Sequence, residues 1–173
     1  AIEAVTQAGG WVFRMGDPSM TFLPSMPQVI DYAHHEIRSD WMDIFLGATC
    51  RFCIGTSSGY FRIPRYFGVP VLFTNVSPGV EYFSMRKNDL TIMRLLKFKD
   101  ANKYLSFQKL LSPPISMAFQ DAHFPAGVEY NENTPEELEA ATMEMLERTD
   151  GSTSSPKSDD DLQRRFKTLA ETC

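Results

Sequence analysis

The feature that most constrains the fold is a short apolar segment that ends in small residues and is followed by a helix and another apolar segment. Phe52–Ile54 is predicted to be a buried strand that stops at Gly55–Gly59. Tyr60–Phe67 is predicted to be a short helix ended by Gly68, and Val69–Phe73 to be the next strand. Short apolar strands that alternate with helices are typical of a parallel sheet covered on both faces. We therefore expect an α/β, doubly wound, Rossmann-like fold.

The segments before this unit continue the same alternation. Trp11–Arg14 and Val29–Tyr32 are predicted strands, and the proline-rich segment Met15–Gln28 between them is predicted to be a loop. Ser39 is predicted to cap an amphipathic helix whose apolar side chains recur at helical spacing as far as Thr49. The order of these elements supports the α/β prediction.

The pattern becomes less regular after the strand at Val69–Phe73. Tyr104–Leu111 is predicted to hold at most one helix, and Val128–Tyr130 is predicted to be an edge strand. Thr134 followed by proline and two glutamates predicts a helix N-terminus, and this helix is expected to run to about Arg148.

The length of 173 residues and a hydrophobic content of 43% fit one globular core with a tail. We expect one α/β domain over residues 1–149. Residues 150–173 are expected to form a linker, up to Asp160, and a C-terminal helix from Asp161 to Glu171. Ile2–Ala8 resembles the last turns of a helix, so we also expect a partner domain N-terminal to this sequence.

The composition argues against several classes of protein. A formal charge of −5 is unfavourable for a protein that binds nucleic acid over a broad surface. The sequence contains neither a transmembrane segment nor a signal sequence, and its three cysteines do not make a disulfide framework, so we expect a cytoplasmic protein. We expect no metal site, because the pair Cys50 and Cys53 lacks a second pair and Asp159–Asp161 lie where acids cap a helix.

The turn at Thr56, Ser57, Ser58 and Gly59 is the strongest candidate for a binding site. A strand that ends in small residues and leads into a helix presents free amides, hydroxyls and the positive end of a helix dipole. A diphosphate fits such a turn, which lies at the edge of the sheet where ligands bind. The turn matches neither a Walker loop nor a G-x-G-x-x-G fingerprint. The alternative is an ordinary strand-to-helix turn in which serine only caps the helix.

Several segments resemble a bacterial family of glycosyltransferases, and the similarity covers most of the chain. More distantly, the Gly55–Val71 block is similar to the sugar-nucleotide site of GT-B heptosyltransferases and fucosyltransferases, in which the corresponding loop holds the donor diphosphate. The resemblance implies that the chain is the C-terminal, nucleotide-sugar-binding half of a GT-B glycosyltransferase. The segments that carry the family resemblance are Gly10–Met20, Asp31–His34, Arg38–Asp43, Gly55–Gly59, Phe67–Val71, Asn133–Glu137 and Leu162–Phe166.

Charged and polar residues near the predicted strand ends are candidates for ligand contacts. Arg14 ends the first strand, so we expect it to neutralise the leaving diphosphate, with a surface salt bridge as the alternative. Arg38 is a second candidate phosphate ligand, with a solvated loop charge as the alternative. The candidates for contacts to the nucleoside or sugar are Asp31, His34, Asp40 and Asn75. Asp17 is expected to cap a turn.

The resulting hypothesis is a glycosyltransferase that transfers a sugar from a nucleotide-diphosphate sugar to an acceptor hydroxyl. The expected partners are the nucleotide sugar, a glycan or protein acceptor, and the N-terminal domain, without which this half is expected to be inactive. No metal or other cofactor is expected. Two alternatives remain open from the sequence: a module that binds a nucleotide or glycan without turnover, and a sugar-nucleotide epimerase of GT-B-like fold.

Overall fold

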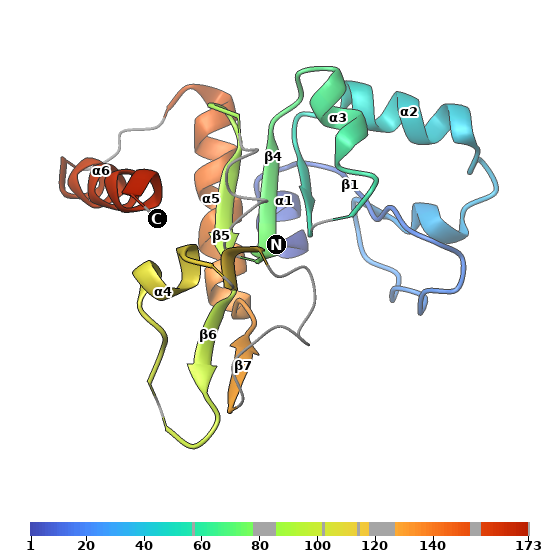
Figure 1. Cartoon of the computed structure of the whole chain (residues 1–173). Helices are drawn as coiled ribbons and strands as arrows, with labels where there is room; N and C mark the ends of the chain where they lie inside the picture. The colour runs from blue at the N-terminus through green and yellow to red at the C-terminus, as the bar shows by residue number, and fades with distance from the viewer. Residues whose placement is uncertain are drawn as a thin grey trace.

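A parallel sheet of three strands forms the centre of the molecule (Figure 1). The sheet consists of β3 (Cys53–Gly55), β4 (Val71–Val76) and β5 (Leu90–Met93), in the order β3-β4-β5. The mixed α/β class predicted from the sequence is therefore confirmed. This computed structural model describes residues 1–56, 58–77, 86–101, 103–113, 115–117, 127–152 and 157–172, with the backbone alone at 157–159 and 172.

A second, smaller parallel pair precedes this sheet in the chain. α1 (Ile2–Gln7) leads into β1 (Val12–Phe13), which pairs with β2 (Val29–Ile30). The predicted strand at residues 29–32 is wrong in its second half, because Tyr32 begins the 3-10 helix η1 (Tyr32–His34). The Tyr32 side chain is fully buried, and its hydroxyl donates to a carboxylate oxygen of Asp43 at 2.7 Å. This contact draws the chain out of the strand direction.

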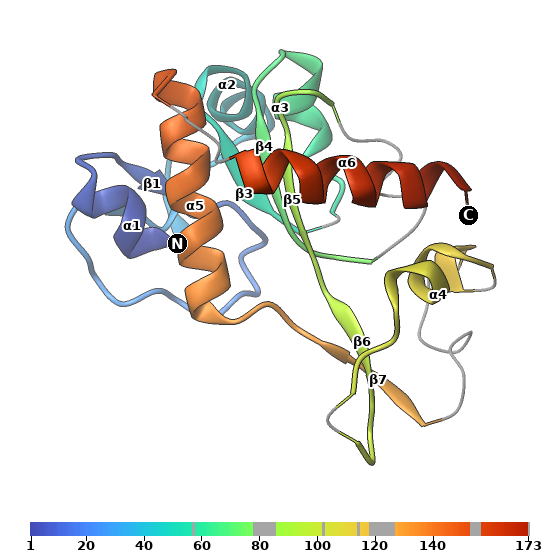
Figure 2. The same cartoon turned by 90° about the vertical axis from the view of Figure 1, so that its left-hand side faces the viewer.

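Apolar clusters lie on both faces of the central sheet. On one face Leu72 packs against Ala141 and Met145 of α5 (Pro135–Asp150), which Figure 2 shows lying along the strands. On the other face Val71, Phe73 and Val76 pack together with Phe61, which immediately precedes α3 (Arg62–Tyr66). The alternation of inward side chains along β4 thus places neighbouring residues in two separate cores.

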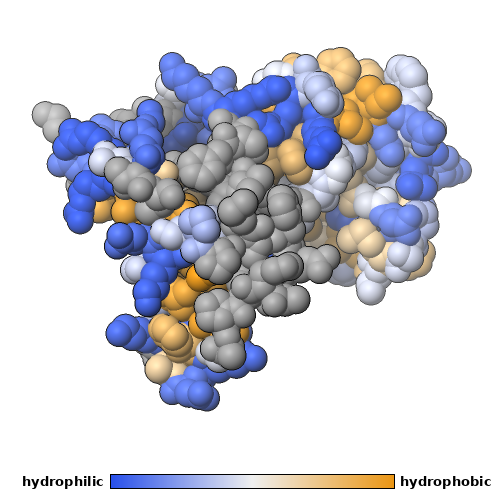
Figure 3. Space-filling model, in the orientation of Figure 1, coloured by the Kyte–Doolittle hydropathy of each residue, from blue (hydrophilic) through white to orange (hydrophobic). Residues whose placement is uncertain are grey.

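Helix α2 (Asp40–Thr49) begins as predicted, because the Ser39 hydroxyl accepts a hydrogen bond from the Met42 amide. Its expected apolar face is only partly buried, since Trp41 and Phe45 stack on each other at the surface. The helix packs against α3 through Gly47, where a Cβ would lie 2.8 Å from a methyl of Ile63. This close approach orients the helix so that Trp41 and Phe45 point outward. Figure 3 shows hydrophobic residues at the surface over α3 and the adjoining part of α2.

The C-terminal half contains strands that the sequence analysis did not predict. β5 and β6 (Leu95–Phe98) are separated by Arg94, and β6 pairs with β7 (Val128–Asn131) in an antiparallel ribbon below the sheet (Figure 1). The edge strand predicted at residues 128–130 is confirmed as β7. α4 (Phe107–Leu111) and η3 (Ile115–Met117) pack beside this ribbon, where Leu96, Leu110 and Ile115 share one core.

One of the two long C-terminal helices agrees with its prediction, and the other starts earlier than predicted. α5 is confirmed from its start, where Thr134 and Glu137 form a capping box and Pro135 opens the helix, and it ends at Gly151 in the left-handed region. α6 (Lys157–Thr172) starts earlier than predicted, so the predicted linker is wrong over residues 157–160. Acidic residues near a helix N-terminus favour the helix, because they interact with its dipole, and Asp160 and Asp161 lie near the start of α6. Phe166 of α6 meets Phe107 of α4 edge to face at 5.1 Å.

The contact between α5 and the sheet provides a test of the fold. Met145 is fully buried against Leu72, whereas Met143 is 43% exposed on the same helix. We expect Met145→Ala to lower the free energy of unfolding by about 2–5 kcal/mol, because a cavity opens in the core. Met143→Ala is expected to change it by less than about 0.5 kcal/mol. Urea denaturation of both variants measures the difference, and equal losses would contradict the packing described here.

Candidate anion-binding site at the carboxyl edge of the sheet

The carboxyl ends of the three central strands carry polar residues. Thr56 directly follows β3, Ser77 directly follows β4, and Arg94 directly follows β5. Because the three strands are parallel, these residues lie along the same edge of the sheet, which is the lower edge in Figure 1. Ligands of open α/β sheets bind at this edge.

The turn after β3 is open to solvent. Thr56, Ser58 and Gly59 are exposed, and a Cβ placed on Gly55 or Gly59 would meet nothing within 4 Å among the described residues. Ser57 lies outside the described residues. The Thr74 hydroxyl donates to the Gly55 carbonyl at 3.4 Å and joins the end of β3 to β4. A hydrogen bond thus fixes the residue before the turn, and Thr56, Ser58 and Gly59 are accessible to solvent.

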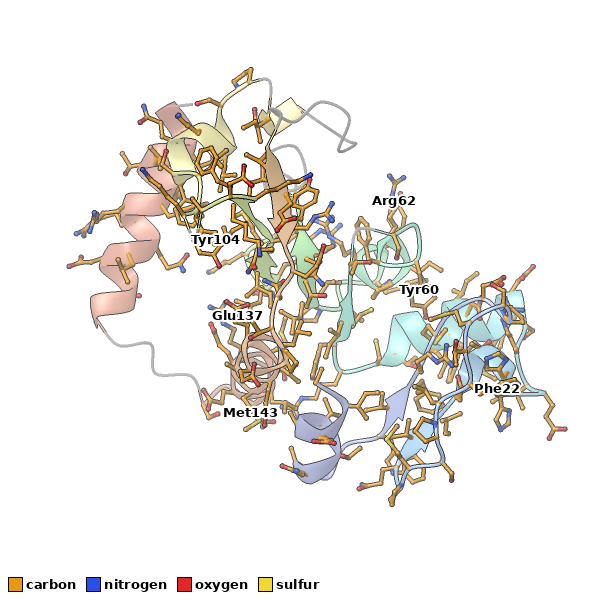
Figure 4. The ribbon with its side chains drawn as sticks, turned by 90° about the horizontal axis from the view of Figure 1, so that it is seen from below. Phe22, Tyr60, Arg62, Tyr104, Glu137 and Met143 are labelled. Carbon is orange, nitrogen blue, oxygen red and sulfur yellow. The ribbon has the colours of Figure 1, made fainter. Side chains whose placement is uncertain are left out.

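The helix after this turn is shorter than predicted and starts later. α3 begins at Arg62 and spans five residues, whereas the prediction placed its start at Tyr60. The amides of Arg62 and Ile63 already donate to the carbonyls of Gly59 and Tyr60. In Figure 4, which shows the molecule from below, Arg62 projects outward. The Tyr60 hydroxyl donates to the Asp43 carbonyl at 3.0 Å. Hydroxyls and amides of the turn, rather than a helix dipole, are thus the groups that this turn offers to an anion.

Arg94 is a fixed cation at the end of β5. Its guanidinium carbon lies 3.4 Å from the centroid of the Tyr130 ring, and one terminal nitrogen donates to the Ser77 hydroxyl at 3.0 Å. The other terminal nitrogen lies 3.3 Å from a carboxylate oxygen of Glu132. Strands β4, β5 and β7 thus all contribute to the position of this guanidinium.

Asn75 has a structural partner at the same edge. Its side-chain oxygen accepts from the Asn133 amide at 2.7 Å, and the Asn133 side-chain oxygen accepts from the Asn75 amide at 2.7 Å. Asn75 lies inside β4 with a φ of 52°, a conformation that asparagine tolerates better than most residues. The pair joins β4 to the segment that precedes α5, so the predicted contact of Asn75 with a nucleoside or sugar competes with this role.

Arg14 and Asp31 form an ion pair at the carboxyl ends of β1 and β2. The closest nitrogen and oxygen are 2.7 Å apart, and the two side chains are 13% and 19% exposed. Arg14 also donates to the Thr21 carbonyl, and Asp31 accepts from the Leu23 amide. Burial alone would raise the pKa of Asp31, but the Leu23 and Arg14 hydrogen bonds hold it below its ordinary value. The pair therefore fastens the loop over residues 15–28 to the sheet edge.

His34 belongs to the same cluster. Its Nε2 lies 2.9 Å from the Met20 carbonyl and 4.0 Å from Asp31 Oδ2. The ring of Phe22 stacks on the His34 ring at 3.7 Å, and Figure 4 shows Phe22 at the outer side of the molecule. The structure thus brings together three of the residues predicted for the site, Arg14, Asp31 and His34, and each is engaged by the loop.

The remaining predicted residues are Arg38 and Asp40, which lie exposed around the start of α2. The Asp17 side chain accepts from the Ser19 amide, as expected for a turn cap. This hydrogen bond, together with the charge of Arg38, lowers the pKa of Asp17. The predicted phosphate contact of Arg38 stays a prediction.

The part of the chain that the structure describes holds no group of three or more histidine, cysteine or acidic side chains placed to bind a metal ion. Cys50 and Cys53 are both free thiols. Burial, and secondarily the neighbouring Cys50, raises the pKa of Cys53 to about 12, so this thiol stays protonated at neutral pH. Across the same described residues, no helix combines the length and apolar character needed to cross a membrane.

Neither a protein-family model, a curated protein nor a solved structure matches the chain. The function therefore has to be inferred from the residues at the sheet edge.

Arg94, Ser77 and Glu132 belong to this edge and were missed from the sequence. Arg94 is the one charged residue between Leu90 and Leu96, at the point where β5 ends and β6 begins. Its contacts with Ser77 and Glu132 join segments that are 17 and 38 residues away in the sequence, and no local pattern predicts them.

The lowered pKa of Asp31 predicts how stability depends on pH. Because the folded-state pKa lies below the ordinary value of 3.8, ionised Asp31 stabilises the fold above that value. The stabilisation is lost as the pH falls through the folded-state pKa. Asp31→Asn is therefore expected to lower the unfolding temperature at pH 7, and the gap to the wild type should close below about pH 4. A pH series of thermal unfolding measures this gap.

Asp100→Asn is a matched control, because Asp100 is exposed in the turn after β6. This variant is expected to follow the wild type at every pH. A constant difference between Asp31→Asn and the wild type over the whole pH range would contradict the ion-pair explanation.

Proposed function

We propose that the chain is the nucleotide-sugar-binding half of a GT-B glycosyltransferase. The observation that carries the proposal is the turn after β3 at the carboxyl edge of a parallel sheet, where Thr56, Ser58 and Gly59 are exposed. Such a turn offers main-chain amides and small hydroxyls to a diphosphate without steric obstruction. Apolar clusters on both faces of the sheet favour the doubly wound arrangement that this class of enzyme uses.

In the proposed reaction the donor diphosphate binds at the turn, and an acceptor hydroxyl attacks the anomeric carbon of the sugar. The new carbon–oxygen bond forms as the bond to the diphosphate breaks, and the hydroxyl proton passes to a general base. We assign that base and the acceptor site to an N-terminal partner domain. The edge of the sheet stabilises the negative charge that develops on the leaving diphosphate.

A panel of nucleotide-diphosphate sugars tests donor binding directly. A true donor is expected to raise the unfolding temperature, since binding to the folded state adds about 2.7 kcal/mol of stability at a concentration of 100 Kd. Ser58→Asp is expected to abolish the shift, because it places a carboxylate at the turn. Asn88→Asp adds the same charge before β5, at the opposite edge of the sheet, and is expected to leave the shift intact.

Donor binding by Ser58→Asp at wild-type strength would show that the turn is not the diphosphate site. If no nucleotide sugar stabilised the wild type, the proposed function itself would be wrong. Product analysis with the bound donor then separates the classes of activity, because transfer requires an acceptor, epimerisation converts the donor alone, and a binding module leaves the donor unchanged.

A further inference from the structure

The guanidinium of Arg94 lies at the sheet edge as a pre-positioned donor. It rests on the Tyr130 ring at 3.4 Å and is oriented by the hydrogen bond to Ser77. Its side chain is 27% exposed, so it is accessible to a ligand without being mobile in solvent. Its Nε–H is buried and finds no hydrogen-bond partner among the described residues. An arginine held in this way loses little conformational freedom when it binds an anion.

Glu132 is the one counterion recorded for Arg94 within the described residues, and it is a weak one. Its carboxylate oxygen lies 3.3 Å from the guanidinium, and its side chain is 55% exposed. Exposed ion pairs of this kind contribute little to stability. A phosphate group carries more negative charge than one carboxylate and accepts two hydrogen bonds from a guanidinium at once. A phosphate at this edge therefore competes well against Glu132.

We propose that Arg94 is the cation that binds a phosphate group at this edge. Ser77 orients its guanidinium, and Glu132 forms an ion pair with it when no anion is bound. The identity of the ligand as a nucleoside diphosphate rests on the proposed function. The assignment differs from the sequence prediction, which gave this role to Arg14. Arg14 is held by Asp31 in a pair whose side chains are 13% and 19% exposed, whereas the Glu132 side chain that faces Arg94 is 55% exposed.

A purely structural role for Arg94 predicts different results. In that case Arg94 only joins β5 to Tyr130 of the ribbon, and Glu132 supports it. Removing the Glu132 charge would then leave anion binding unchanged or weaken it. If Glu132 competes with the ligand, removing its charge strengthens anion binding. The two explanations thus differ in the direction of the effect.

Isothermal titration with inorganic pyrophosphate, and with UDP, GDP, ADP and CDP, measures the effect on the whole chain. Arg94→Gln is expected to weaken binding of pyrophosphate and of the preferred nucleotide about tenfold or more, as for the loss of a hydrogen bond to a charged group. Glu132→Gln is expected to strengthen both by roughly two- to fivefold. Arg94→Lys keeps the charge and is expected to recover part of the affinity, since lysine lacks the planar fork.

Lys97 and Glu129 supply matched controls. They form an ion pair of the same length, 3.3 Å, within the β6–β7 ribbon, with side chains 33% and 45% exposed. Lys97→Gln and Glu129→Gln make the same charge changes and are expected to leave both affinities within about twofold of the wild type. If Lys97→Gln and Arg94→Gln weakened binding equally, the change in net charge alone would explain the result, and the assignment of Arg94 would be overturned.

The outcomes separate this inference from the proposed function. Binding of pyrophosphate that depends on Arg94, without binding of any nucleotide sugar, supports the anion site and refutes the transferase proposal. A nucleotide sugar that binds the wild type and Arg94→Gln equally well supports the transferase proposal and overturns the inference. A wild type that binds none of the probes overturns both. If Arg94→Gln does not fold, the direction of the Glu132→Gln effect decides.

Discussion

Parallel pairing of β3, β4 and β5 is the constraint on which the rest of the site depends. Residues 17 or more positions apart, such as Ser77 and Arg94, become neighbours because each follows a strand that ends at the same edge. An antiparallel arrangement would send alternate strand ends to opposite edges. Polar residues that directly follow these strands therefore lie on the same side of the sheet, although β4 runs three residues past the level of Gly55. The three residues that do so are Thr56, Ser77 and Arg94.

Polar contacts fix the carboxyl ends of β4 and β5. The reciprocal pair of Asn75 and Asn133 joins β4 to the start of α5, and the Asn133 side-chain nitrogen donates to the Met93 carbonyl at 3.0 Å. These bonds satisfy main-chain groups at the ends of β4 and β5, groups that would be costly to leave unpaired. Helix α5 packs on the sheet through Met145, and the Asn75–Asn133 pair fixes the segment just before its N-terminus. The same helix is therefore tied both to the core and to the carboxyl edge of the sheet.

Sequence reasoning succeeded where the determinants of structure are local. The caps at Ser39 and Thr134 are confirmed because a hydroxyl reaches an amide only a few residues away. The boundary at Tyr32 was missed because a distant carboxylate, Asp43, draws the tyrosine out of the strand. The site divides in the same way. The turn after β3 was predicted from adjacent small residues, and its role in binding stays a prediction. Arg94 takes its position from Tyr130 and Ser77, which no local pattern links to it.

The two arginines at strand ends differ in how firmly their carboxylate partners are held. Arg14 and Arg94 each follow a strand directly, and each lies near a carboxylate. Asp31, however, also accepts a hydrogen bond from the Leu23 amide, and these bonds lower its pKa. Displacing it from Arg14 would leave a carboxylate that is only 19% exposed without its cation. Glu132 is exposed and can return to water at little cost. The availability of a cation for an incoming anion is therefore decided by how firmly its resident counterion is held.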